Sequence, residues 1–165
     1  MSHAKNKVEW CLRKAEEEMK LKGRHRGLIK TEEDIFAARK HIEKAKRYLE
    51  ATLVLKENFS DISASTIFYS MYHSLLSIIS KFEYESGNQE CTFALIYSLI
   101  EEKKINLDKR IIDKVSLINS EEMSIIELRE KYQYGIELSM KEDIFNENFD
   151  IAKILLGKVK EIIEK

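Results

Sequence analysis

The sequence predicts an all-α fold: an up-and-down antiparallel helical bundle of about four to five core helices, with extra N- and C-terminal helices. The first observation is that the 165 residues include no proline and only five glycines, so few residues interrupt a helix. The second is that apolar residues recur at steps of three and four, the spacing of an amphipathic helix. The third is that short polar turns separate these stretches, and helices joined in this way pack as antiparallel neighbours.

Length and composition indicate a single domain, 1–165. The apolar content of 44% is too high for a disordered tail. The 28 Lys+Arg nearly cancel the 29 Asp+Glu, so net charge points to neither a nucleic acid nor an acidic partner. We expect the core at 31–135, preceded by an N-terminal helix and basic connector (1–30) and followed by a C-terminal helix at 147–164.

The first expected helix covers 4–22. It is charged and lacks the apolar core of a secretory signal. Cys11 and Cys91 are far apart in sequence and in no metal-binding spacing, so we expect two buried or half-buried thiols in a reducing compartment. These features favour a cytoplasmic location.

A basic connector, KLKGRHRGLIK (Lys20–Lys30), follows this helix. It holds five Lys or Arg and no acid, so Lys22, Arg24 and Arg26 are candidates to bind phosphate. No aromatic residue interleaves them, so base stacking is not indicated. The alternative is a solvated, charged connector without a ligand.

The second helix is expected to begin at Thr31, with acidic residues at 32–34 near its positive end. One inward stripe follows, formed by Ile35, Ala38, Ile42, Ala45, Leu49 and Leu53. The third helix, 62–84, is apolar around most of its circumference, which predicts a central place in the bundle. Its most apolar run, 67–79, is too short and too polar to span a bilayer, so no membrane association is expected.

A polar stripe runs along this central helix. Ser65, Tyr69, His73 and Ser77 recur every fourth residue and therefore share one face. One interpretation is a polar pocket in which His73 exchanges protons near neutral pH. The other, which we favour, is a buried network in which the polar groups satisfy one another.

The remaining pattern predicts a shorter helix at 90–102 and one or two helices within 111–131. Residues 134–148 read as a loop or broken segment, and a last amphipathic helix is expected at 149–163. The glycine-rich phosphate loops are missing, as are the HExxH and paired CxxC patterns of metal sites. We therefore expect neither a cofactor nor a bound metal.

Three segments carry a resemblance to a known family. They are the A-x-x-Y-L-E-A stretch at Ala45–Ala51, the F-Y-S-M-Y-H stretch at Phe68–His73 and the R-x-x-x-x-Y-G stretch at Arg129–Gly135. In this order they resemble the HEPN family (higher eukaryotes and prokaryotes nucleotide-binding), particularly its small stand-alone prokaryotic and archaeal members. The resemblance covers about 38–135 and implies a bundle of four or five helices that commonly dimerises.

The resemblance also implies a functional segment. Many members of the family are metal-independent ribonucleases, with an arginine followed after four to six residues by a histidine. Arg129 matches the arginine, whereas Tyr134 stands where the shortest form of the motif has histidine. Tyrosine, with a pKa near 10, is a poor base at neutral pH, so this departure weakens the ribonuclease reading unless His73 supplies the imidazole.

Three functions stay open. The first is a non-catalytic or weakly catalytic module that binds a nucleotide or RNA phosphate through Arg129, Tyr134, Tyr69 and His73. It would be a homodimer, in some settings paired with a minimal nucleotidyltransferase in a toxin–antitoxin system. The second is a ribonuclease toxin that uses Arg129 with Tyr134 or His73, and the third is a purely structural scaffold.

Overall fold

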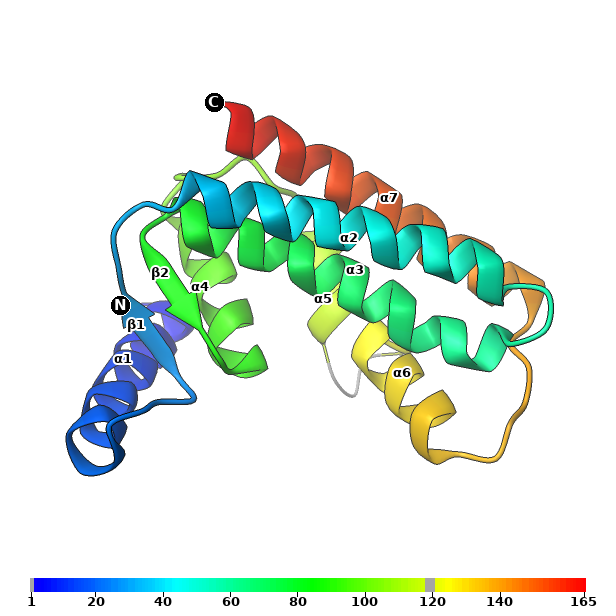
Figure 1. Ribbon diagram of the computed structural model, residues 1–165, viewed down its shortest axis with the longest axis horizontal. Helices are drawn as coiled ribbons and strands as arrows, with labels where there is room; N and C mark the ends of the chain where they lie inside the picture. Colours follow the sequence, from blue (N-terminus) through cyan, green and yellow to red (C-terminus); the bar gives the residue numbers. More distant parts are fainter. Residues whose placement is uncertain (1, 118–120) are drawn as a thin grey trace.

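Three long helices form the centre of the protein. The computed structural model describes residues 2–117 and 121–165, and within them α2, α3 and α7 run side by side along the long axis (Figure 1). The helices are α1 His3–Lys22, α2 Ile35–Leu55, α3 Ser60–Lys81, α4 Gln89–Glu101, α5 Lys109–Ser116, α6 Ile125–Tyr134 and α7 Glu142–Glu164, and the strands are β1 Leu28–Lys30 and β2 Tyr84–Ser86. The all-α bundle predicted from the sequence is confirmed.

α3 is the central helix of the core. α2, α6 and α7 all pack against it. Small hydroxyl residues face α2, where Ser77 donates a 2.7 Å hydrogen bond to the Ala38 carbonyl and Ser70 donates a 2.9 Å one to Ala45. Among the described residues α3 is also the one helix long and apolar enough to cross a membrane, but 61% of that apolar window is buried in the protein. This burial fits the core helix of a bundle.

α7 belongs to the same core and begins earlier than the sequence predicts. It starts at Glu142, inside the stretch expected to be a loop, and Glu142 and Asp143 lie at its positive end. Its inward face packs on α2 and α3 through Phe145, Ala152, Leu155, Leu156, Val159, Ile162 and Ile163. The core therefore extends beyond the predicted range of 31–135 and includes the C-terminal helix.

The helices predicted at 4–22 and 90–102 agree with α1 and α4 to within a residue at each end. The stretch 111–131 contains two helices, α5 and α6, and residues 118–120 between them lie outside the described part of the chain.

α2 begins at Ile35, four residues later than its predicted start at Thr31. Asp34 is its N-cap, because the Asp34 carboxylate accepts a 2.7 Å hydrogen bond from the Ala37 N–H. The Thr31 hydroxyl instead donates to the neighbouring Glu32 carbonyl. The acidic residues before Asp34 made the earlier start look favourable, but they lie in the preceding loop.

Replacing this cap tests the position of the helix start. We expect Asp34→Ala to lower the free energy of unfolding by about 1 kcal/mol, because one N–H of the first turn loses its partner. Thr31→Ala is the control, with an expected change within about 0.5 kcal/mol. Urea unfolding followed by circular dichroism measures both changes. A larger loss of stability in Thr31→Ala than in Asp34→Ala would indicate that the helix begins at Thr31.

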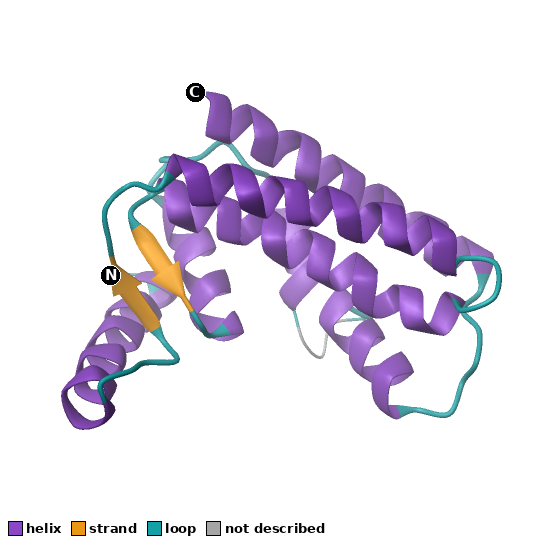
Figure 2. Ribbon diagram, in the orientation of Figure 1, coloured by secondary structure: helices purple, strands orange, loops and turns teal. Residues whose placement is uncertain are grey.

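A two-stranded sheet lies at the open end of the α2–α3 pair, with β1 before α2 and β2 after α3. The sequence pattern did not predict this sheet. β1 lies inside the basic connector and pairs antiparallel with β2, with Leu28 opposite Ser86 and Lys30 opposite Tyr84 (Figure 2). α3 accordingly ends at Lys81, before its predicted end at 84. Strands of three residues are too short to show an alternating pattern.

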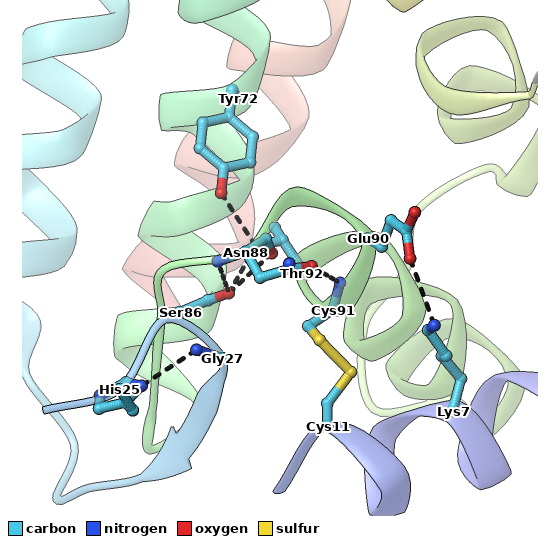
Figure 3. Close-up of a disulfide and its surroundings, with 10 residues drawn as sticks. All are labelled: Lys7, Cys11, His25, Gly27, Tyr72, Ser86, Asn88, Glu90, Cys91 and Thr92. Atoms are coloured by element: carbon cyan, nitrogen blue, oxygen red, sulfur yellow. Dashed lines mark hydrogen bonds and ion pairs between the residues drawn. A yellow bond between two sulfur atoms is a disulfide. The ribbon is translucent and has the colours of Figure 1, made fainter. Parts of the chain in front are cut away.

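Cys11 and Cys91 form a disulfide, so the expectation of two free thiols was wrong. Cys11 lies in the middle of α1 and Cys91 in the first turn of α4, and their Cα atoms are 6.0 Å apart (Figure 3). α1 packs on α4 and β1, which brings the two positions together. Sequence spacing alone could not reveal this pairing, because it depends on how two helices far apart in the chain pack.

Candidate functional site

Arg129 is held on the inner side of α6. The helix begins with a capping box, in which Ser124 and Glu127 each accept a backbone N–H of the other residue. The apolar side chains of α6 then pack on α3, and the buried ones are Ile125, Ile126, Leu128 and Tyr132. The long side chain of Arg129 also reaches the surface of α3, where it contacts Phe68.

The guanidinium of Arg129 stacks on an aromatic ring of α3. Its central carbon lies 4.2 Å from the centroid of the Phe68 ring, and only 11% of the side chain is exposed. One terminal nitrogen is 4.0 Å from the carboxylate of Glu130, a long contact. The Nε atom is the one buried side-chain nitrogen or oxygen without a hydrogen-bond partner in the described part of the chain. The arginine is thus fixed in place with a donor unused.

Tyr134 does not lie beside this guanidinium. It is the last residue of α6 and is 78% exposed. At roughly 100° per residue, it projects about 140° around the helix from Arg129. Gly135 ends the helix, and a side chain there would clash with the carbonyl oxygen of Lys131. The helix end therefore requires glycine at this position of the R-x-x-x-x-Y-G segment for a structural reason.

His73 faces α2 instead of α6. Its Nδ1 lies 3.0 Å from the Nδ1 of His41, so one imidazole donates an N–H to the other. Phe68 and His73 project about 140° apart around α3, at roughly 100° per residue. Because Arg129 lies over Phe68, the structure does not bring His73 next to the arginine.

The polar stripe of α3 is part of the contact with α2. Tyr48 of α2 stacks on both His73 (5.5 Å between centroids) and Tyr69 (5.6 Å), and the Tyr69 ring meets Phe68 edge-on at 5.3 Å. Of the sequence-predicted candidates, Tyr69 is therefore the one that shares a neighbour with Arg129. The geometry agrees with the buried-network interpretation, since Ser77 and His73 both find partners on α2.

Sequence reasoning missed three residues of this region: His41, Tyr48 and Phe68 as partners of His73, Tyr69 and Arg129. A signal was present for two of them, because His41 and Tyr48 are seven positions apart and so share a face of α2. Phe68 belongs to a stretch that carries the family resemblance, but nothing in the sequence pairs it with Arg129.

Burial makes the two histidines hard to protonate. It lowers the pKa of His73 to about 4, with further contributions from His41 and Lys44. Burial is also the main cause that lowers the pKa of His41, followed by Lys44, while Asp34 acts in the opposite direction. Both imidazoles are therefore neutral at pH 7, and the pair is a poor source of protons there.

This pair gives stability a pH dependence. In the unfolded chain a histidine titrates near pH 6.5, so the unfolded state takes up protons first as the pH falls. The stability that is present above pH 6.5 is lost between pH 6.5 and about 4, the pKa of His73 in the folded protein. Because the ring is only half-buried and partly screened, we expect the loss from His73 to be about 1–2 kcal/mol.

Urea unfolding across this pH range measures the effect. His73→Gln should flatten the wild-type curve between pH 6.5 and 4, whereas His3→Gln, at the exposed start of α1, should leave it unchanged. Parallel curves for wild type and His73→Gln would contradict the lowered pKa.

The basic connector lies far from Arg129. Lys22, Arg24 and Arg26 are exposed at the end of α1 and in the segment between α1 and β1. α1 and β1 lie at the left of Figure 1, whereas α6 lies in its right half. The Arg26 N–H donates to the Glu18 carboxylate, and His25 accepts from the Gly27 N–H and lies 3.8 Å from Glu85. The structure therefore does not join the two sets of candidate phosphate-binding residues into one site.

A groove of about 670 Å³ runs between α5, α6 and α7, and Arg129 does not line it. Its apolar floor includes Leu128, Ile144 and Ile151. In residues 2–117 and 121–165 there is no group of three or more His, Cys, Asp or Glu that could hold a metal ion. No family model matches the chain, and no curated protein is significantly similar to it.

Proposed function

We propose that this chain is a HEPN-like module that binds a phosphate of a nucleotide or RNA through Arg129 and has little or no catalytic activity. The observation that carries the proposal is the guanidinium stacked on Phe68 with its buried Nε unpaired. A buried donor without a partner is costly, and a phosphate oxygen would satisfy it once a small shift of the side chain exposes the nitrogen. Stacking on the ring keeps the guanidinium in position, so little side-chain freedom remains to be lost on binding.

The binding function is favoured over the ribonuclease because neither His73 nor Tyr134, the two candidates for proton transfer, lies beside Arg129. His73 pairs with His41 on another face of α3, and Tyr134 projects away into solvent. Cleavage by a 2′-hydroxyl benefits from a group that exchanges protons near pH 7. Arg129 alone can hold a phosphate and stabilise its charge.

A second protein surface would complete the site. Arg129 does not line the grooves of about 670, 570 and 530 Å³ in the described part of the chain, so these grooves would not enclose a ligand bound at Arg129. We propose a homodimer in which a second copy covers this face, with a minimal nucleotidyltransferase as the other candidate partner. We also propose a cytoplasmic location, where nucleotides and RNA are found; the Cys11–Cys91 disulfide is instead typical of an oxidising compartment.

Affinity for nucleotides and short RNA tests the proposal. We expect Arg129→Ala to weaken binding about tenfold or more, since hydrogen bonds to a charged partner contribute about 1.5–3 kcal/mol. The control is Arg24→Ala on the distant connector, which should leave nucleotide affinity unchanged. Calorimetry at about 50 and 200 mM salt should also show weaker RNA binding at the higher salt.

An RNA incubation in EDTA separates binding from cleavage. Intact RNA together with Arg129-dependent binding supports the module. Cleavage that disappears in Arg129→Ala would establish the ribonuclease instead. Absence of any nucleotide or RNA binding would leave the structural scaffold as the function.

A further inference from the structure

α1 lies at the edge of the fold (Figure 1). It packs mainly on α4 and β1, and none of its buried side chains is larger than valine: they are Ala4, Val8, Cys11 and Ala15, with Leu12 partly buried beside them. Its polar links to the bundle include an exposed ion pair from Lys7 to Glu90, at 3.2 Å. Exposed pairs contribute little to stability, and small side chains bury little apolar area. The disulfide is therefore the strongest link between α1 and α4.

The two cysteines differ in their surroundings. Cys91 lies in the first turn of α4, where Asn88 caps the helix and accepts a 2.9 Å hydrogen bond from the Cys91 N–H (Figure 3). The positive end of a helix favours a thiolate, so Cys91 is the better leaving group. Cys11 lies mid-helix, where no helix end stabilises its thiolate.

A groove of about 530 Å³ runs along the disulfide. Both cysteines line it, and the charged residues around them are Lys14 and Glu18 of α1, Arg26 of the connector and Glu90 of α4. The sulfur-bearing residues themselves are buried, with Cys11 1% and Cys91 3% exposed. A reductant thus has space to approach, but it reaches the sulfurs only when α1 moves. Because α1 packs mainly on α4 and β1, such a movement does not require the α2–α3–α7 core to unfold.

We propose that Cys11–Cys91 is an exchangeable disulfide, a redox site that locks α1 onto α4 and that a dithiol reductant opens. The thiolate of the dithiol forms a bond to the Cys11 sulfur, and the Cys11–Cys91 bond breaks with its electron pair leaving on Cys91. The second thiol of the reductant then attacks the reductant's other sulfur, which is bonded to Cys11 in the mixed disulfide, and the Cys11 thiolate is released. Two electrons and two protons pass to the protein, and the dithiol becomes a disulfide.

Reduction changes the structure by releasing α1. Without the covalent bond, only the small buried side chains and exposed polar contacts hold the helix. We expect α1 to lose its hydrogen-exchange protection about tenfold or more on reduction, while α3 keeps its protection. The part of the basic connector that precedes β1 would be freed with it, while β1 stays paired with β2.

Native reduction of the oxidised protein tests the proposal. Dithiothreitol is added without denaturant, free thiols are alkylated at intervals, and mass spectrometry counts them. We expect reduction about tenfold or more faster than global unfolding, which is measured by exchange of the α3 amides. Reduction that proceeds only at the rate of global unfolding would show a sealed structural cross-link and overturn the proposal.

Two further readouts examine the direction of attack and the role of the groove. Glutathione should be trapped on Cys11 and not on Cys91, and the reverse would contradict the leaving-group assignment. Lys14→Gln should slow reduction about twofold or more, because it removes a positive charge that attracts thiolates. The matched control is Arg13→Gln, the neighbouring exposed cation that does not line the groove. Equal rates in the two variants would exclude approach through the groove.

Discussion

Replacing Phe68 with alanine should lower the free energy of unfolding by about 3–5 kcal/mol, because a fully buried phenylalanine leaves a cavity that the surrounding helices fill only in part. Phe68 is completely buried between α3 and α6. Its ring packs against Tyr69 and Tyr72 as well as Arg129. Urea unfolding measures the loss, and Phe36→Ala is the control, since that ring is 74% exposed and its removal should change stability by about 0.5 kcal/mol or less.

A milder variant separates packing from the role of the ring. Phe68→Leu keeps an apolar side chain of similar volume but removes the aromatic face under the guanidinium. We expect the protein to stay folded while Arg129 becomes mobile and nucleotide affinity falls. An unchanged affinity in Phe68→Leu would mean that stacking is not what positions Arg129.

Removing the disulfide should lower the free energy of unfolding by about 2–4 kcal/mol, because the bond closes a long loop in the unfolded chain. The two cysteines are separated by 80 positions. For a chain of this size we expect the melting temperature to fall by about 5–15 °C. Calorimetry of the Cys11→Ala, Cys91→Ala double variant measures it.

Fully reduced wild type is the matched control for this variant. It should melt within about 2 °C of the double variant, since both lack the cross-link and keep the same small side chains. A double variant that melts at the same temperature as oxidised wild type would show that the cross-link does not constrain unfolding.

Helix periodicity was sufficient for the fold class because the inward stripes of α2, α3 and α7 are long. Helix periodicity did not locate a helix start correctly where that start depends on one polar group. Asp34 caps α2 through its own carboxylate, although Thr31 and the acids that follow it have an equally good pattern. α7 starts at Glu142 because Phe145 docks on the core, a tertiary contact that no local pattern contains.

The residues of the candidate site could be predicted from the sequence, but their arrangement in space could not. The sequence singled out Arg129, Tyr69 and His73, and all three lie on α6 or on the α3 surface. It could not tell that His73 and Phe68 face different neighbours, because that depends on how α2 and α6 are arranged around α3. The pairing of Cys11 with Cys91 was hidden for the same reason: α1 meets α4 only after folding.

The side-chain NMR signal of Arg129 tests most directly whether this arginine binds phosphate. The Nε–Hε resonance is assigned from its loss in Arg129→Ala, and adenosine monophosphate is then titrated into the wild-type protein. We expect this resonance to shift saturably as the unpaired Nε gains an acceptor, while the resonance of Arg24 on the connector stays in place. A saturating ligand that leaves the Arg129 resonance unmoved would contradict the proposed site.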